Sequence, residues 1–283
     1  MVEKGVIHIT PKGNKVFNYI ITYKCNNNCI MCINNQPDNR IDPKIDDIKN
    51  IISKLDKNVN YLFITGGEPT LRKEFFEIMD FINTNFKGEI HLLTNARMFS
   101  YDKFMYKFNS LKINKIILGV PLYAHEKNVF EAVSRAKQSY SQTILGIKNL
   151  LSYNYEVELR IIIHKLNYKI LPDIAHYILK ELPSIKNVFF ANMEYVGNGL
   201  KNKKALYVRL EDVKPYLQNA VDILESKTNI SINQMPLCKL DKKYHKHADN
   251  CTVVPNEHMF LKECYNCRLK MKCSGYWRSY IGL

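Results

Sequence analysis

The chain has 283 residues, which is the length of one large domain or of one domain with an appendage. Hydrophobic residues make up 46% of it and charged residues 24%, so a sizeable core is available and wholesale disorder is excluded. The formal net charge of +14 suggests an acidic partner, such as an acidic peptide, RNA or a nucleotide-like cofactor. No apolar run reaches the ~18 residues of a membrane span. The N-terminus lacks a secretory signal, so we expect a cytoplasmic protein without membrane contact.

Short β-rich runs alternate with amphipathic helical stretches along most of the chain. The expected strands are residues 18–23, 61–65, 90–94, 115–120, 156–163 and 187–191, and the expected helices are residues 43–55, 71–85, 101–111, 139–151, 169–182 and 210–226. Apolar strands that alternate with helices predict an α/β fold with a parallel sheet curled into a partial (β/α)6 TIM-like barrel. In such folds the chemistry lies in the loops at the carboxyl ends of the strands.

A change of composition near residue 233 marks a tail rich in Cys and Lys, which is too small for a conventional core and needs a staple. We therefore expect an N-terminal extension at 1–17, the barrel at 18–232 and a small C-terminal domain at 233–283. A further short strand is expected at 229–233, just before the tail's first cysteine.

The eight cysteines fall into two groups separated by about two hundred residues. A disulfide framework is improbable in a chain of this length without a signal peptide, so the close spacings indicate metal. The first group is Cys25, Cys29 and Cys32, in a loop that three consecutive Asn residues favour. Three thiolates cannot complete a structural zinc site, but they can hold three irons of a [4Fe–4S] cluster and leave the fourth open. A zinc loop with a distant fourth ligand, or buried thiols without metal, are the alternatives.

This C-x3-C-x2-C motif resembles that of the radical S-adenosylmethionine (SAM) superfamily, in which the amino and carboxylate groups of SAM chelate the open iron. The second expected strand ends in Gly66, Gly67 and Glu68, which is similar to the GGE motif of that family. The resemblance implies that this loop and the Glu68 carboxylate receive the amino group of SAM. Glycines permit close approach of the backbone to a ligand, which agrees with this role.

Four further residues could contact SAM if the resemblance holds. Asn95 follows the third strand and is a plausible ribose contact, while Arg160, His164 and Asn167 flank the fifth strand and could reach the ribose or the carboxylate. Polar residues at strand ends are also commonly structural groups, so that alternative stays open for each of them.

The second group of cysteines reads C-x2-C-x5-C at Cys264, Cys267 and Cys273. Alone it could be a zinc ribbon completed by Cys238 or by a histidine of the 244–247 segment. Behind a radical SAM barrel it resembles the auxiliary-cluster extensions called SPASM and, in a shortened form, twitch. Too few cysteines are present for two auxiliary clusters, and the resemblance implies one auxiliary [4Fe–4S] cluster on Cys238, Cys264, Cys267 and Cys273.

Cys251 is then the spare thiol of the tail. It could be a loop cysteine without a role, it could replace Cys238 as a ligand, or it could donate a hydrogen atom to a substrate radical.

Stretches spread over nearly the whole chain, from about residue 18 to 277, resemble the His-Xaa-Ser system radical SAM maturase HxsC. They are residues 29–37, 92–95, 120–123, 142–150, 158–164, 236–240 and the closing cysteine motif. The resemblance implies reductive cleavage of SAM to a 5′-deoxyadenosyl radical and modification of a ribosomally made precursor peptide (a RiPP maturase). The implied partners are that peptide, an electron donor such as ferredoxin or flavodoxin, and a second maturase as a further candidate, with no nucleic acid.

Few residues precede the barrel, so recognition of a leader peptide should use the barrel, the tail or another protein. Lys239, Lys242, Lys243 and Lys246 form a basic patch that could hold an acidic leader, or simply a solvated face. The competing functions are RNA modification, activation of another enzyme as in anaerobic sulfatase maturation, and a zinc-stapled binding protein without catalysis.

Overall fold

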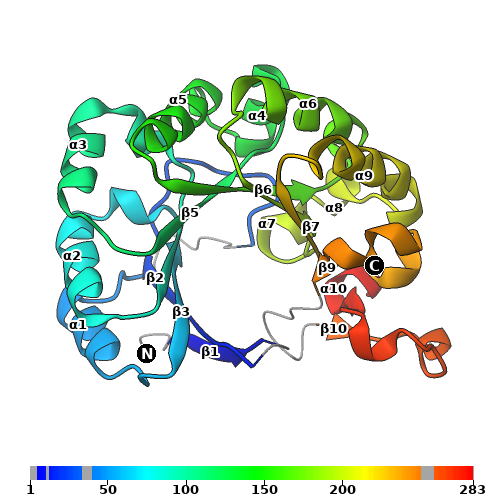
Figure 1. The fold of residues 1–283 in the computed structure, drawn as a ribbon, viewed down its shortest axis with the longest axis horizontal. Coiled ribbons are helices and arrows are strands. Elements are labelled where there is room, and N and C mark those ends of the chain that lie inside the picture. The colour runs from blue at the N-terminus through cyan, green and yellow to red at the C-terminus, as the bar shows by residue number, and fades with distance from the viewer. Residues whose placement is uncertain (1–4, 11–12, 34–39, 250–257, 283) are drawn as a thin grey trace. The chain divides into compact units, whose positions relative to one another are not determined.

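The computed structural model describes residues 5–10, 13–33, 40–249 and 258–282, and the chain forms two compact units. The first unit comprises Met1–Asn28, Gln36–Val120 and Ala136–Val157, and the second comprises Cys29–Asn35, Pro121–Arg135 and Glu158–Leu283. The helices and strands are labelled in Figure 1.

The first unit is a sheet with helices along one face. Its elements are β1 (Val6–Ile9), β2 (Lys15–Thr22), α1 (Ile45–Ser53), β3 (Val59–Gly66), α2 (Phe75–Asn85), β4 (Glu89–Leu93), α3 (Asp102–Ser110), β5 (Ile116–Pro121) and α5 (Ser139–Ser152). The strands lie in the order β1-β2-β3-β4-β5, with β1 antiparallel to β2 and the following neighbours parallel. Thr22, the last residue of β2, lies opposite Gly66, the last residue of β3. The loops that follow these two strands therefore begin side by side.

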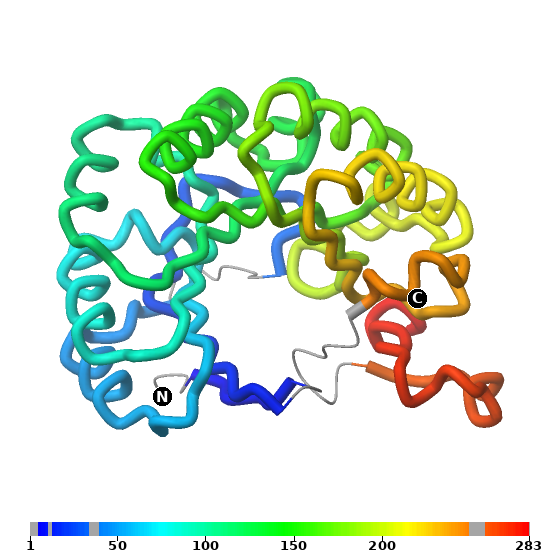
Figure 2. The backbone as a smooth tube through the Cα atoms, in the orientation of Figure 1, coloured from blue at the N-terminus to red at the C-terminus, as the bar shows by residue number. Residues whose placement is uncertain are grey.

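The second unit continues the same alternation and carries the tail. Its elements are α4 (Lys127–Ser134), β6 (Glu156–Ile163, whose first two residues belong to the first unit), α6 (Leu171–Glu181), β7 (Asn187–Asn192), α7 (Gly197–Lys201), α8 (Lys203–Leu206), α9 (Leu210–Leu224), β8 (Asn229–Asn233), β9 (Ala248–Asp249), β10 (His258–Met259), β11 (Tyr276–Trp277) and α10 (Arg278–Ile281). The order β6-β7-β8-β9 is parallel, and β10 pairs with β11 in a separate antiparallel ribbon. Figure 2 traces the tail after α9 in orange and red.

Hydrophobic periodicity explains which faces are covered. Helix α2 buries one stripe at spacings of three and four residues: Phe75, Ile78, Met79 and Ile82. Strand β6 buries every second residue, whereas Glu158 and Arg160 occupy its half-exposed face. Helix α2 and strand β6 thus each have one buried apolar face and one more polar face.

The α/β partial barrel expected from the sequence is confirmed. All the expected strands and helices are present, and β6 and β8 have the expected bounds. Helix α2 begins at Phe75 rather than residue 71 because Pro69–Leu71 form a separate 3-10 turn, capped by the Glu68 side chain. Strand β1 and helix α4 were not expected. Within the part of the chain that the structure describes, no helix is long and apolar enough to cross a membrane.

Candidate active site

In the first unit, the Gly-Gly turn after β3 packs directly against the backbone that leads into the cysteine loop. The Gly67 N–H donates to the Thr22 carbonyl at 2.8 Å, and the Glu68 N–H donates to the Lys24 carbonyl at 2.7 Å. A Cβ on Gly66 would collide with the Thr22 carbonyl oxygen, and one on Gly67 would lie 2.6 Å from that of Tyr23. Glycine is therefore required here for contact between two stretches of backbone, immediately before Cys25.

The Glu68 carboxylate is buried, with 1% of the residue exposed, and accepts four hydrogen bonds from its surroundings. Its Oε1 accepts from the Thr70 N–H (3.2 Å), the Thr70 hydroxyl (2.6 Å) and the Thr94 hydroxyl (2.6 Å), and its Oε2 accepts from the Asn95 N–H (2.7 Å). Burial raises the pKa of Glu68, and these four donors act in the opposite direction. The carboxylate thereby joins the loop after β3 to the loop after β4.

Asn95 and Arg97, in the loop after β4, hold the first half of the cysteine loop. The Asn95 side-chain amide donates to the Asn26 side chain at 2.7 Å. The Arg97 guanidinium donates to the Asn26 carbonyl at 2.5 Å, to the Asn27 side chain at 2.8 Å and, through Nε, to Gln142 at 2.7 Å. The expected contact of Asn95 with SAM stays a prediction. Arg97 was assigned no role from the sequence, because nothing local indicates that it reaches back 71 residues.

In the second unit, the segment from Cys29 to Cys32 is held mainly through its backbone. The Asn198 N–H donates to the Cys32 carbonyl at 2.9 Å, and the Asn198 side chain donates to the Cys29 carbonyl at 3.3 Å. Gly197 has a φ of 53°, and a Cβ there would lie 2.8 Å from the Cys32 carbonyl oxygen. The Ile30 N–H donates to the Val133 carbonyl at 2.9 Å. Helices α4 and α7 therefore determine the path of the segment that carries two of the three cysteines.

Two of the cysteine sulfurs lie near hydrogen-bond donors. The Asn27 N–H donates to the Cys25 sulfur at 3.4 Å, and the Tyr123 hydroxyl lies 3.2 Å from the Cys29 sulfur. Cys25, Cys29 and Cys32 are half-buried and form no disulfide. Hydrogen bonds to sulfur favour the thiolate, which is the form that binds iron.

The three residues predicted around the fifth strand all have structural partners in the second unit. Asn167 accepts from the His164 N–H (2.9 Å) and donates to the carbonyls of Ile162 (2.9 Å) and Tyr123 (3.2 Å). Arg160 pairs with Glu158 at 2.7 Å and lies 3.9 Å from the centre of the Phe189 ring. The contacts of these side chains with SAM stay predictions.

His164 is completely buried, and burial lowers its pKa to about 4, so its imidazole is neutral at pH 7. Its Nδ1 accepts from the Leu166 N–H at 3.3 Å, which places the proton on Nε2. Among the described residues that Nε2 has no hydrogen-bond partner.

Tyr276 lies beside Cys238, the first cysteine of the tail. The Tyr276 hydroxyl is 3.8 Å from the Cys238 sulfur, and burial raises the pKa of Tyr276, with smaller contributions in the same direction from Cys238 and Cys264. The Cys273 sulfur accepts the Leu237 N–H at 3.3 Å, which places it beside the Cys238 segment. The turn from Cys264 to Cys267 is closed by a backbone hydrogen bond of 3.2 Å. Cys251 lies outside the described residues, as does the 34–37 part of the HxsC-like stretches.

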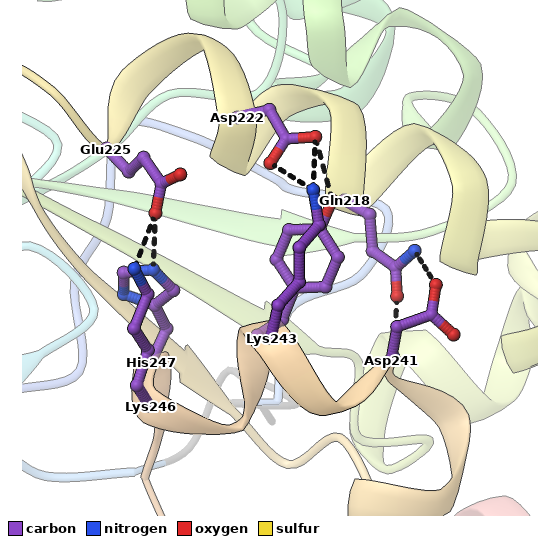
Figure 3. Close-up of polar contacts among 8 residues, drawn as sticks. Gln218, Asp222, Glu225, Asp241, Lys243, Lys246 and His247 are labelled. Carbon is purple, nitrogen blue, oxygen red and sulfur yellow. Dashed lines mark hydrogen bonds and ion pairs between the residues drawn. The ribbon is translucent and has the colours of Figure 1, made fainter.

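A row of ion pairs joins the tail to α9 (Figure 3). Lys243 lies 3.0 and 3.1 Å from the two carboxylate oxygens of Asp222, and Lys246 lies 2.9 Å from Glu225. The buried Tyr244 hydroxyl also donates to Asp222, at 2.8 Å. Exposed ion pairs contribute little to stability. The buried Tyr244 is therefore the contact that fixes this part of the tail to Asp222 most specifically.

The same contacts change the interpretation of the basic patch. Lys239 pairs with Glu211 at 2.5 Å, so three of the four lysines of the expected patch face carboxylates of α9 or of its C-cap residue, Glu225. Their charge is neutralised within the chain, which does not favour them as a site for an acidic leader.

The donor set of the cysteine loop suits an iron–sulfur cluster. Cys25, Cys29 and Cys32 supply three thiols. A structural zinc ion needs four ligands, whereas three thiolates can hold three irons of a [4Fe–4S] cluster.

A family model described as the Radical SAM superfamily matches residues 19–178. The chain belongs to this superfamily. An uncharacterised protein of Methanocaldococcus jannaschii is 29% identical over 167 residues, which are 56% of this chain and 56% of that protein. A probable GTP 3′,8-cyclase of Sulfurisphaera tokodaii is 21% identical over 211 residues, which are 74% of this chain and 65% of that protein.

Solved structures share the radical SAM fold. SuiB of Streptococcus suis has a TM-score of 0.61 at 16% identity, covering 76% of this chain and 48% of SuiB. The anSMEcpe structure with bound AdoMet and Kp18Cys peptide has a TM-score of 0.60 at 18% identity, covering 77% of this chain and 63% of anSMEcpe. The chain thus spans about half to two thirds of the length of these four proteins. Membership of the superfamily implies a [4Fe–4S] cluster and SAM as cofactors of a radical SAM enzyme.

Proposed function

We propose that this chain is a radical SAM enzyme that modifies a ribosomally made precursor peptide, in the manner of the His-Xaa-Ser system maturases. The observation that carries the proposal is the cysteine-bearing tail, in which the Cys238 sulfur lies 3.8 Å from the Tyr276 hydroxyl and the Cys273 sulfur accepts from the Leu237 N–H beside Cys238. Such a tail suits an auxiliary cluster of the twitch type. The similarity in fold to SuiB and to peptide-bound anSMEcpe agrees with this assignment.

The proposal gives each group of residues a task. Cys25, Cys29 and Cys32 hold the cluster that supplies the electron for cleavage of SAM to the 5′-deoxyadenosyl radical. The residues assigned to SAM are Gly66, Gly67, Glu68, Asn95, Arg160, His164 and Asn167. The auxiliary cluster takes Cys238, Cys264, Cys267 and Cys273, with Cys251 as an alternative ligand or hydrogen-atom donor.

Positioning of the cysteine loop is the contribution that the described contacts support most directly. Glu68 fixes the loops after β3 and β4 relative to each other, and Arg97 holds Asn26 and Asn27. In the second unit, Asn198 fixes the backbone at Cys29 and Cys32. A ferredoxin or flavodoxin is the expected electron donor.

The first test is the iron content per chain after anaerobic purification and reconstitution. We expect about eight irons in the wild type and about four after replacement of Cys25, Cys29 and Cys32 by Ala, since each [4Fe–4S] cluster holds four irons. Cys238→Ala should lose the auxiliary irons and Cys251→Ala should keep them, whereas the reverse result would make Cys251 the ligand. About four irons in the wild type would remove the auxiliary cluster from the proposal, and zinc in place of iron would overturn the enzymatic function.

Cyclisation of GTP is a second candidate, because several curated relatives are named probable GTP 3′,8-cyclases. The two candidates are separated by anaerobic assays that follow 5′-deoxyadenosine by chromatography. One arm supplies GTP, and the other supplies synthetic peptides that correspond to short reading frames flanking the gene, whose mass is then measured. A mass change of the peptide that requires Cys29 supports the first candidate, and turnover with GTP supports the second.

A further inference from the structure

Tyr123 occupies a fixed position beside the middle cysteine of the loop. It follows β5 by two residues, is 4% exposed, and its hydroxyl lies 3.2 Å from the Cys29 sulfur. The Asn167 side chain donates to its carbonyl oxygen at 3.2 Å, and the Phe130 ring packs against it with a centroid separation of 4.8 Å. The hydroxyl is therefore held at the sulfur by contacts to the backbone and to the ring.

The direction of this hydrogen bond follows from the chemistry of an iron-bound cysteine. A coordinated sulfur is a thiolate and carries no proton, so the Tyr123 hydroxyl must donate and the Cys29 sulfur must accept. The positive end of the O–H dipole then faces the ligand of a cluster that gains negative charge when it is reduced. Hydrogen bonds to sulfur are among the factors that set the reduction potential of such clusters.

We propose that Tyr123 is a positioning residue that raises the reduction potential of the SAM-binding cluster through the Cys29 sulfur. The inference rests on the proposed assignment of the cluster to Cys25, Cys29 and Cys32. It goes further because it assigns an electronic role to a side chain outside the cysteine motif, 94 residues along the chain. Asn167 acquires a corresponding indirect role, since its amide fixes the backbone of Tyr123.

Tyr123→Phe removes the hydroxyl and keeps the ring that packs on Phe130. The reduced cluster is titrated anaerobically by electron paramagnetic resonance, and the change of its signal on adding SAM distinguishes it from an auxiliary cluster. At the wild-type midpoint we expect about a tenfold fall in the ratio of reduced to oxidised cluster, which is about 59 mV for a one-electron couple. Tyr155→Phe is the matched control, because the Tyr155 hydroxyl bonds to Asn109, far along the chain from the cysteines.

A second substitution tests the same hydrogen bond without removing it. Incorporation of 3-fluorotyrosine at position 123 strengthens the hydroxyl as a donor, so we expect the potential to move in the opposite direction. A midpoint unchanged from wild type in either substituted protein, at equal iron content, would overturn the inference. Failure of the proposed cluster assignment is recognised separately, because the wild type itself would then hold no SAM-responsive cluster.

Discussion

Replacement of Glu68 by Gln tests whether this buried carboxylate holds the candidate site together before any ligand binds. Gln has the same shape, but it presents one acceptor oxygen and one NH2 group where the carboxylate presents two acceptors. The hydroxyls of Thr70 and Thr94 can rotate to accept from the new NH2 group. The backbone N–H groups of Thr70 and Asn95, which lie 3.2 and 2.7 Å from the two carboxylate oxygens, cannot do so.

The magnitude follows from this count of donors. In either orientation of the Gln amide, one buried backbone N–H loses its acceptor. A buried donor left without an acceptor costs ~1–3 kcal/mol, and the lost partner is not replaced by water at a residue that is 1% exposed. We therefore expect Glu68→Gln to lower the free energy of unfolding by ~1–3 kcal/mol in the absence of SAM.

The assay is urea unfolding of the protein without SAM, with Glu77→Gln as the matched control. Glu77 lies on α2 with a side chain that is 59% exposed and pairs with Lys49 at 2.6 Å, so its replacement should cost ~0–1 kcal/mol. Equal stabilities of the two variants would refute the structural role of Glu68. Its function would then have to be sought entirely in contacts with SAM.

Three further substitutions test other contacts of the structure. Because the pKa of His164 is lowered from 6.5 to about 4, only the unfolded chain gains a proton as the pH falls through this range. The contribution of His164 to the free energy of unfolding should fall by roughly 3 kcal/mol between pH 6.5 and 4 and then level off. Urea unfolding at several pH values should show a smaller decline in His164→Gln. The control, His176→Gln, should keep the full decline. Arg97→Met should speed the loss of iron to a chelator severalfold, and an unchanged rate would contradict its role in holding the cysteine loop. Tyr244→Phe should lower the free energy of unfolding by ~0.5–1.5 kcal/mol, because it loses the hydrogen bond to Asp222. Limited proteolysis of this variant should cut the tail before the barrel. Equal rates of cutting in the two parts would contradict the role of Tyr244 in fixing the tail to α9.

The regular elements were predictable because their signal is local. Each buried strand or helix face repeats within a few residues, as in β6, where Val157, Leu159, Ile161 and Ile163 alternate with half-exposed positions. Strand β1 was not predicted, because it has only four residues and its Val6, Ile7 and Ile9 are all exposed. An exposed edge strand gives no clear alternation from which it could be identified.

The candidate site also has a part that local sequence patterns predict and a part that they do not. The cysteine spacing and the Gly-Gly-Glu turn could be identified because they are contiguous in sequence. The structure adds a reason for the glycines that the sequence did not indicate, since both make room for the backbone of Thr22 to Lys24, and their contact with SAM stays a prediction. Thr94 and Tyr123 lie in stretches that resemble HxsC, but neither they nor Arg97 were assigned an individual role, because a single Thr, Arg or Tyr after a strand has no pattern that distinguishes it from a surface residue.

The residues that bind the SAM-binding cluster and the residues that orient them lie far apart in the sequence. Cys25, Cys29 and Cys32 fall within eight residues of chain, whereas Tyr123 lies 94 residues and Asn198 lies 169 residues from Cys29. A substitution at a remote group leaves the cysteine motif intact and changes only how its sulfurs and backbone are held. Such variants should therefore still bind a cluster while differing in its potential or lability, whereas loss of a cysteine removes the cluster itself. That contrast separates residues that bind the cofactor from those that position it, through measurements on the cluster alone and without knowledge of the substrate.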